Sequence, residues 1–278
     1  MHSSPLPTLT QGHLNRFEQC PRRYQYQYLE QLGAPLDPER QARTDWGSQF
    51  HRLMQQYVLG LAIAPSPTPT DPAMRQALQS LVATVPAFHN PNARYEAEHR
   101  RLWVGQLKDE QLGVNLGTIA LVGVYDLLAL EPDRAEILDW KTYPKPPHSQ
   151  HLAENWQTLL YPFVLVETSD YQPEQVAMTY WFVQPGQTPT AWQLDYTTSR
   201  HEQTRNRLQA DLKHLQTLTT ALLQRAQAFP AIDAQQQHPR CRYCPFQQRC
   251  QQSQQLGEPP LDPVAQQMAD LPEIALEV

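Results

Sequence analysis

The chain has 278 residues, 40% of them apolar, so it can bury the core of one large domain or two modest ones. Its net charge of −6 excludes binding of nucleic acid through bulk positive charge, although a local basic patch remains compatible with it. The chain has no apolar run of roughly 18 residues and begins without the charged and apolar regions of a signal peptide. We therefore expect no membrane span and a cytoplasmic protein.

The N-terminal third is predicted to be helical. Residues 9–32 have the pattern of two helices interrupted at Cys20-Pro21. Residues 45–61 carry apolar side chains at helical spacing, and residues 73–85 repeat this pattern after a proline-rich connector. We expect a helical insertion at about residues 60–92. The predicted buried face of the 45–61 helix consists of Phe50, Leu53, Met54, Tyr57, Val58 and Leu61.

From about residue 93 the pattern changes to strands. Segments 93–104, 114–130 and 135–143 are separated by short polar turns, which predicts an antiparallel meander. The elements predicted after it are a helix at 151–167, strands at 175–183 and 190–196, and a helix from Ser199 to about Ala228. A capping box of Ser199 and Glu202 is predicted to open the last helix. This order predicts an α/β or α+β fold with a sheet flanked by helices.

Two of the predicted strands carry carboxylates. Asp126 lies in one and Asp139 in the next, and strand alternation places Lys141 on the same face as Asp139. Two converging carboxylates repel each other unless a cation such as Mg²⁺ or Mn²⁺ is bound between them. Lys141 could then position a water molecule or stabilise negative charge on a phosphate. The alternative is two aspartates in turns and a lysine in a surface ion pair.

The spacing of these residues resembles the PD-(D/E)XK nuclease superfamily, specifically its RecB-like branch. The family pattern is Gly-x-x-Asp, then Asp-x-Lys, then Gln-x-x-x-Tyr on the next helix. The matching residues are Gly123 and Asp126, Asp139 and Lys141, and Gln157 and Tyr161. The branch also carries a helical Gly-x-x-x-His motif, which Gly47 and His51 match. The family fold is a restriction-endonuclease-like core with a mixed central sheet flanked by helices.

The resemblance implies a role for each matching residue. The implied metal ligands are the side chains of His51, Asp126 and Asp139 and the backbone carbonyl of Trp140. Lys141 is implied to act with the metal in activating water, while Gln157 and Tyr161 are implied to help hold the nucleic-acid strand. The family also has an acidic residue before the meander. Glu96 and Glu98 both fit, and Glu98 is preferred because it adjoins a strand-like stretch, although alternation points both to one side.

Four cysteines form a further pattern. Cys241, Cys244 and Cys250 have the spacing C-x2-C-x5-C, and Cys20 lies far upstream. In a cytoplasmic protein they are not expected to form disulfides, but four thiolates can hold zinc or an iron–sulfur cluster. The spacing alone does not decide between them, and general chemical considerations slightly favour zinc. Some RecB-like and CRISPR-associated nucleases are similar, with one cysteine before the core and three after it. This resemblance implies a [4Fe–4S] cluster that staples the two ends together.

The resemblance implies one RecB-like nuclease domain over residues 1–256, with its cysteine segment at 238–252 and a poorly packed tail at 257–278. We expect a Mg²⁺- or Mn²⁺-dependent deoxyribonuclease, and specifically an exonuclease that acts on single-stranded DNA or DNA ends in repair or recombination. The chain has no Walker motif, so a helicase or CRISPR adaptation proteins are candidate partners. The alternatives are a nuclease that trims CRISPR spacer precursors and a non-catalytic iron–sulfur module that binds DNA. Candidates for phosphate contacts are Arg22, Arg23, Arg240 and Arg242.

Overall fold

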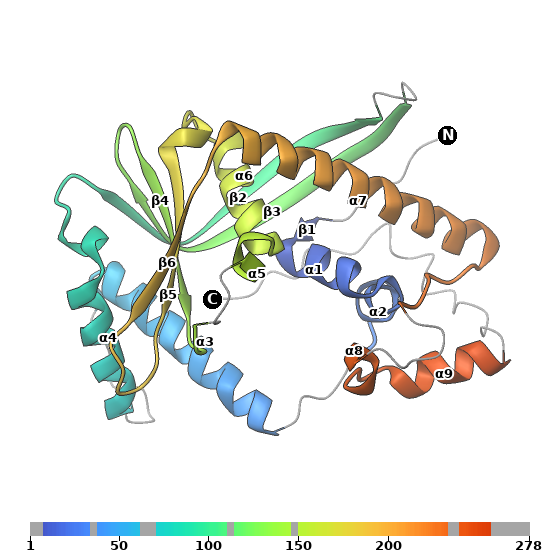
Figure 1. Cartoon of the computed structure of the whole chain (residues 1–278), viewed down its shortest axis with the longest axis horizontal. Coiled ribbons are helices and arrows are strands. Elements are labelled where there is room, and N and C mark those ends of the chain that lie inside the picture. Colours follow the sequence, from blue (N-terminus) through green and yellow to red (C-terminus); the bar gives the residue numbers. More distant parts are fainter. Residues whose placement is uncertain are drawn as a thin grey trace. The chain divides into compact units, whose positions relative to one another are not determined.

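The structure is a computed structural model (Figure 1). It describes residues 8–33, 38–61, 71–109, 114–145, 150–232 and 239–256. Most of the proline-rich connector and the predicted tail at 257–278 lie outside these residues. The described residues fall into two compact units. Unit 1 lies within Met1–Pro35, Val104–Leu121 and Asn206–Val278, and unit 2 lies within Leu36–Trp103 and Val122–Arg205.

A mixed six-stranded sheet is the centre of the fold. Its strands are β1 (Leu9–Thr10), β2 (Arg94–Asp109), β3 (Val114–Leu130), β4 (Ala135–Lys141), β5 (Val176–Phe182) and β6 (Thr190–Asp195). The strand order is β1-β3-β4-β5-β6, and β2 also pairs with β3. The β3–β4 and β5–β6 pairs are antiparallel, whereas β4 and β5 are parallel. The predicted mixed α/β fold is therefore confirmed.

The central strands of unit 2 are covered on both faces. All seven residues of β5 are buried, as are five of the seven residues of β4. Because β4 and β5 are parallel, their connection must cross back over the sheet, and it contains α5 (Gln150–Ala153) and α6 (Trp156–Glu167). The sequence predicted one helix here. Two are found because Asn155 caps α6, its side chain accepting a hydrogen bond from the Gln157 backbone at 2.9 Å.

Two helices pack together in unit 2 (Figure 1). They are α3 (Pro38–Val58) and α4 (Pro72–Thr84), which precede the single turn η2 (Pro86–His89). Their apolar faces share a core cluster with β3 and β4, to which α3 contributes the buried side chains of Phe50, Leu53 and Met54. The predicted buried face of this helix was too long at its C-terminal end. Tyr57 is 39% exposed, and Leu61, which lies beyond the end of α3, is 56% exposed.

The long helix α7 (Thr198–Arg225) begins earlier than predicted. The Thr197 hydroxyl accepts a hydrogen bond from the Arg200 backbone at 3.2 Å, and the Thr197 carbonyl accepts one from the His201 backbone at 2.9 Å. Thr197 is therefore the cap, and the predicted capping box of Ser199 and Glu202 is wrong. Before it, the short turn η3 (Pro173–Gln175) leads into β5.

Unit 1 contains helices from both ends of the described chain. They are α1 (Gln11–Gln19), α2 (Pro21–Tyr24), the π-helical turn η1 (Gln25–Leu29), α8 (Pro239–Arg242) and α9 (Gln247–Leu256). Cys20 is extended and separates α1 from α2, as the sequence predicted. The buried Gln25 side chain accepts a hydrogen bond from the Phe229 backbone at 2.7 Å, which ties the N-terminal helices to the segment after α7. None of the helices in the described ranges is long and apolar enough to span a membrane.

Candidate functional site

Three side chains from three elements of unit 2 converge into a group that could hold a metal ion. His51 comes from α3, Glu98 from β2 and Asp126 from β3. Each offers a ligand atom, and these atoms all lie within 4.8 Å of one another. His51 Nδ1 lies 3.2 Å from Asp126 Oδ1. All three side chains are half-buried, so the group remains accessible to solvent.

The backbone of β2 explains why Glu98, rather than Glu96, joins this group. Glu98 has φ of 48°, which is in the left-handed region and interrupts the alternation of the strand. Its carboxylate lies with His51 and Asp126. Glu96 instead forms ion pairs with Arg94 at 2.8 Å and with His99 at 3.3 Å. The two glutamates, which alternation could not separate, therefore have different surroundings.

A glycine allows α3 to approach the end of β4 closely. A Cβ atom at Gly47 would lie only 3.0 Å from Thr142 Oγ1, so a larger residue would force the Thr142 side chain to shift. His51 lies four residues later on the same helix face. Gly47 thus favours the close packing of the helix face that also carries His51, which is a physical reason for the Gly-x-x-x-His spacing.

Asp139, Lys141 and Gln157 form a second set of polar contacts in the same unit. Lys141 Nζ lies 2.5 Å from Asp139 Oδ1 and donates a hydrogen bond to Gln157 Oε1 at 2.7 Å. Gln157 Nε2 donates to the other Asp139 oxygen, Oδ2, at 2.5 Å. Gln157 therefore holds both members of the Asp-x-Lys motif. Asp139, predicted as a metal ligand, is not part of the three-residue group, because Lys141 and Gln157 contact its carboxylate.

The sequence did not single out Tyr180, which lies beneath Lys141. Asp139 is the register partner of Tyr180 in the parallel β4–β5 pair, and Lys141 Nζ lies 5.0 Å from the centroid of the Tyr180 ring. The Tyr180 hydroxyl lies 2.8 Å from Thr158 Oγ1, and Trp192 stacks on its ring. A fixed aromatic face is thus presented to the amine. Only the strand pairing reveals this contact, so the sequence pattern carried no signal for it.

Trp140 and Tyr161 connect the two sets of contacts. The Trp140 backbone N–H donates a hydrogen bond to Asp126 Oδ2 at 2.8 Å, which links β4 to the three-residue group. The buried Tyr161 accepts a hydrogen bond from the Tyr125 hydroxyl through its backbone carbonyl at 3.0 Å. Burial raises the pKa of the Tyr161 hydroxyl, while a hydrogen bond with Gln157 opposes that shift. The Tyr161 side chain is therefore next to the residue that holds Lys141.

The site concentrates more negative charge than its surroundings neutralise. Burial and then Asp126 raise the pKa of Glu98 to about 7, and His51 opposes this shift. Burial and then Asp126 also raise the pKa of Asp139 to about 7, and Lys141 opposes this shift. Burial lowers the pKa of His51, but its hydrogen bond with Asp126 outweighs burial and leaves the value raised. A divalent cation would relieve the repulsion among these carboxylates.

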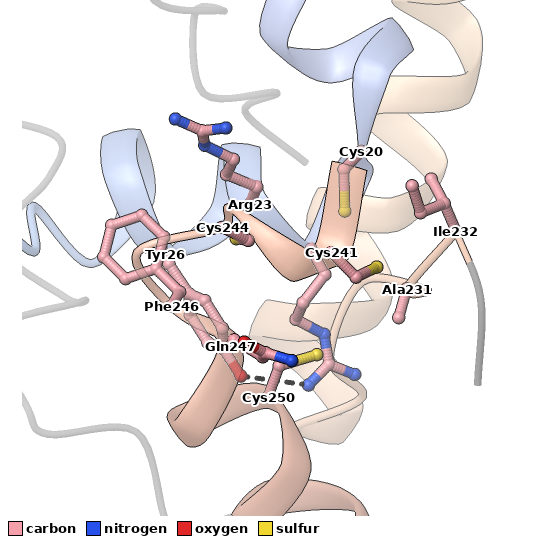
Figure 2. A pocket seen from close by; sticks show the side chains of 11 residues that line it. Cys20, Arg23, Tyr26, Ala231, Ile232, Cys241, Cys244, Phe246, Gln247 and Cys250 are labelled. Carbon is pink, nitrogen blue, oxygen red and sulfur yellow. Dashed lines mark hydrogen bonds between the residues drawn. The ribbon is translucent and has the colours of Figure 1, made fainter. Parts of the chain in front are cut away.

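The four cysteines lie around one pocket of unit 1 (Figure 2). Cys20 comes from the N-terminal segment, whereas the other three cysteines come from α8, α9 and the turn between them. Burial raises the pKa of the Cys250 thiol; Arg22 opposes this shift, and the other three cysteines reinforce it. The four sulfur atoms are therefore close enough to influence one another.

Aromatic and charged contacts hold the cysteine segment against η1. Tyr26 packs on Phe246 with 5.6 Å between ring centroids, and Arg249 lies 5.3 Å from the Tyr26 ring centroid. Arg249 also forms an ion pair with Glu30 at 2.9 Å. The pocket thus joins segments separated by more than two hundred residues without any covalent link between them.

The mixed sheet, with acids on adjacent strands and a lysine two residues after the second acid, defines a nuclease core. The model of the PD-(D/E)XK nuclease superfamily matches residues 8–251, and the chain belongs to this superfamily. Among solved structures, a candidate exonuclease from Eubacterium rectale is similar, with 8% identity and a TM-score of 0.48 over 75% of this chain and 79% of that one. The structure of a protein named SSO0001 is 14% identical, with a TM-score of 0.36 over 88% of this chain and 85% of that one. No curated protein matches the sequence.

Proposed function

We propose that this nuclease is a Mg²⁺- or Mn²⁺-dependent deoxyribonuclease that acts as an exonuclease on single-stranded DNA or DNA ends. The observation that carries the proposal is the arrangement of His51, Glu98 and Asp126 in one unit with the Asp139–Lys141 pair. Membership of the nuclease superfamily supports hydrolysis of phosphodiester bonds. Residues 1–256 would constitute one RecB-like nuclease domain.

The donor set fits a hard divalent cation. Carboxylate oxygens are preferred by Mg²⁺ and Mn²⁺, and Mn²⁺ also accepts an imidazole nitrogen. His51, Glu98 and Asp126 would hold the ion, with Asp139 and the Trp140 carbonyl as further ligands. When bound, the ion would supply Lewis-acid stabilisation of the phosphate and make water more acidic.

Lys141 is positioned to act on a phosphate and on water. Burial lowers the pKa of its amine, but contact with Asp139 opposes this effect and leaves the pKa raised. Lys141 would stabilise negative charge on the phosphate and, together with the metal, orient and activate water. Gln157 would keep the amine directed, and Tyr161 would support Gln157 and the bound strand.

We propose a role in DNA repair or recombination for this nuclease. The sequence has no Walker motif, so a helicase acting with it would be a separate protein. Trimming of CRISPR spacer precursors, with adaptation proteins as partners, is the alternative role. A non-catalytic iron–sulfur module that binds DNA is the alternative from another class. The presence of Asp126, Asp139 and Lys141 argues against this last function.

We further propose that the four cysteines hold a [4Fe–4S] cluster. The proposal is supported by the position of all four thiols at one pocket and by the C-x2-C-x5-C spacing, which resembles that of RecB-like nucleases with such a cluster. A zinc ion held by the four thiolates is the alternative. Visible absorbance and the iron, sulfide and zinc content of anaerobically purified protein test this assignment.

The test of the nuclease is cleavage of end-labelled single-stranded DNA with Mg²⁺, Mn²⁺ or EDTA. Wild-type protein should cleave only with the metals, and Asp139→Ala should lose cleavage while it keeps the cluster absorbance. Asp170→Ala is the matched control, because Asp170 is an exposed aspartate in the turn after α6. This control should cleave at the wild-type rate.

The outcomes separate the proposed functions. A ladder of products that shortens from one end indicates an exonuclease, whereas internal fragments indicate an endonuclease. Full activity of Asp139→Ala would contradict the assigned site. DNA binding without cleavage by any metal would favour the non-catalytic module.

A further inference from the structure

The residues around the thiol pocket are basic, although the whole chain is acidic. The described segments 8–33 and 239–256 contain six arginines and two glutamates. Both glutamates are neutralised within unit 1: Glu18 pairs with Arg207 at 2.5 Å, and Glu30 pairs with Arg249 at 2.9 Å. Arginines therefore outnumber glutamates in these described segments, in a protein whose net charge is −6.

Two of these arginines lie at the thiol pocket. Arg22 and Arg23 line it together with the cysteines (Figure 2). Arg22 donates hydrogen bonds to the Phe229 carbonyl and to the Tyr26 hydroxyl, which hold its guanidinium at the pocket. Both arginines are only partly exposed, so they belong to the pocket rather than to the open surface.

A second group of side chains in the same segment faces solvent. Tyr243, between Cys241 and Cys244, is 70% exposed and is the most exposed large apolar side chain among the described residues. The Arg242 guanidinium carbon lies 5.8 Å from the centroid of its ring, and Arg240 and Arg242 are both exposed. None of these three residues is among those that line the pocket.

The turn that carries Tyr243 is fixed at both ends. The Cys244 backbone N–H donates a hydrogen bond to the Cys241 carbonyl at 3.0 Å, and the Gln247 N–H donates to the Cys244 carbonyl at 3.1 Å. Phe246 is buried against Tyr26. An exposed ring on an anchored turn can accept a stacking partner without loss of backbone entropy on binding.

We propose that Tyr243, Arg240 and Arg242 form a binding surface for single-stranded nucleic acid, here named the Tyr243 surface. A nucleobase stacks on the Tyr243 ring, and the two arginines contact the adjoining phosphates. Stacking of this kind is available to any unpaired base, whereas the bases of a duplex already stack on one another. The inference rests on the proposed function and adds to it a strand-binding site remote in sequence from the catalytic motifs.

The first experiment measures binding by fluorescence anisotropy, with the full chain purified anaerobically and with EDTA present to prevent cleavage. The probes are a fluorescein-labelled oligothymidylate and a labelled duplex of equal length. Tyr243→Ala should weaken binding of the single strand about tenfold, which corresponds to the loss of one stacked base. Tyr243→Phe keeps the ring and should bind like wild type. Tyr57→Ala, which removes an exposed tyrosine from α3, is the matched control and should also bind like wild type.

Binding of the duplex probe shows whether Tyr243→Ala removes a stacking contact with an unpaired base or lowers the affinity for every nucleic acid. Tyr243→Ala should leave the affinity for the duplex unchanged. An equal loss on both probes would contradict the proposal, and so would wild-type affinity of Tyr243→Ala for the single strand. Visible absorbance and the melting temperature of each variant verify that the thiol site is intact.

The second experiment tests the arginines through salt dependence. The double variant Arg240→Gln, Arg242→Gln should reduce the slope of log K against log salt by about 1.4, because two phosphate contacts are lost. Arg75→Gln on α4 is the control, since Arg75 is also exposed. If Arg240 and Arg242 only balance the charge of the thiol site, the double variant will change the visible absorbance and leave the slope unaltered, which would overturn the proposal.

The cleavage and binding experiments together distinguish failure of the Tyr243 surface from failure of the proposed deoxyribonuclease function. If wild-type protein cleaves single-stranded DNA and Tyr243→Ala binds it equally well, only the Tyr243 surface is refuted. If wild-type protein neither cleaves nor binds DNA, the deoxyribonuclease proposal fails and the Tyr243 surface fails with it.

Discussion

The carboxylate site of unit 2 and the thiol pocket of unit 1 are built in different ways. The carboxylate site places hard oxygen and nitrogen donors on paired strands and packed helices, and its members are joined by direct hydrogen bonds. The thiol pocket places soft sulfur donors on short helices and in the breaks between them, at the two ends of the described chain. Its members are held through neighbouring side chains, such as Tyr26, Phe246 and Arg249.

This difference indicates what each region requires from its cofactor. In unit 2, paired strands and direct hydrogen bonds position the carboxylates, so we expect a bound ion to affect the reaction more than the fold. In unit 1, a bound cluster would itself connect Cys20 to the C-terminal cysteines. We therefore expect loss of the cluster to affect folding and loss of the ion to affect reaction rate.

The largest expected effect is on stability and comes from the thiol pocket. Cys20→Ser removes the N-terminal attachment of the proposed cluster, which would close a long loop, and should lower the free energy of unfolding by about 3–5 kcal/mol. Urea titrations followed by circular dichroism, together with iron analysis, measure this change. Asp139→Ala should show the converse result, with cleavage lost and iron content unchanged.

One result would contradict this difference between the two regions. It is a Cys20→Ser variant that has lost iron but unfolds at the same midpoint urea concentration as the wild-type protein. The pocket would then be held by its protein contacts alone.

A smaller effect is expected when a divalent ion binds to the carboxylate site. An ion that binds only the folded state stabilises it by about 2.7 kcal/mol at a hundredfold excess over its Kd, which should raise the melting temperature by several degrees. Glu98→Gln should abolish most of this rise in Mn²⁺. Glu96→Gln is the matched control on the same strand and should retain it, because Glu96 pairs with Arg94 and His99.

Differential scanning fluorimetry with and without Mn²⁺ distinguishes the two glutamates directly. A rise that survives in Glu98→Gln and disappears in Glu96→Gln would reverse the assignment of the acidic ligand.

The smallest expected effect concerns Tyr180 as a positioning residue for Lys141. A desolvated cation–π contact contributes about 2 kcal/mol, so Tyr180→Leu should lower kcat by up to about thirtyfold. KM for DNA should not change, because Tyr180 is buried and lies beneath the amine. Tyr180→Phe preserves the aromatic face and should restore nearly full activity.

Steady-state kinetics on a short single-stranded substrate measure both parameters. Equal losses in the phenylalanine and leucine variants would show that the hydroxyl contact with Thr158, and not the ring, is what the site needs.

Motif spacing predicted much of the carboxylate site. Asp126, Asp139, Lys141 and Gln157 lie in one unit because adjacent strands and the helix that follows them are fixed by short connections. Glu98 was preferred over Glu96 only for its strand-like neighbours, because strand alternation treats the two alike and the positive φ of Glu98 is not visible in the sequence. Tyr180 was missed because its place beside Asp139 depends on strand pairing across a long crossover.

The remaining differences arise at the ends of helices. The predicted face of α3 included Leu61, because helical spacing continues in the sequence after the backbone has left the helix. Thr197 caps α7 in place of the predicted Ser199. The sequence could not separate the two residues, because both are followed by helix-compatible residues and periodicity does not fix the first turn of a helix. The cysteine count indicated a four-thiolate site, and Arg22 and Arg23, which the sequence offered as candidates for phosphate contacts, line the pocket with the cysteines.

The left-handed backbone at Glu98 has an evolutionary consequence. A glutamate in this conformation costs the folded protein roughly 1–3 kcal/mol, which glycine would largely recover. Selection for stability alone would therefore remove this side chain, and only selection for its carboxylate opposes that drift. A descendant without selection for nuclease activity would be expected to lose Glu98 early and to become more stable as it did so.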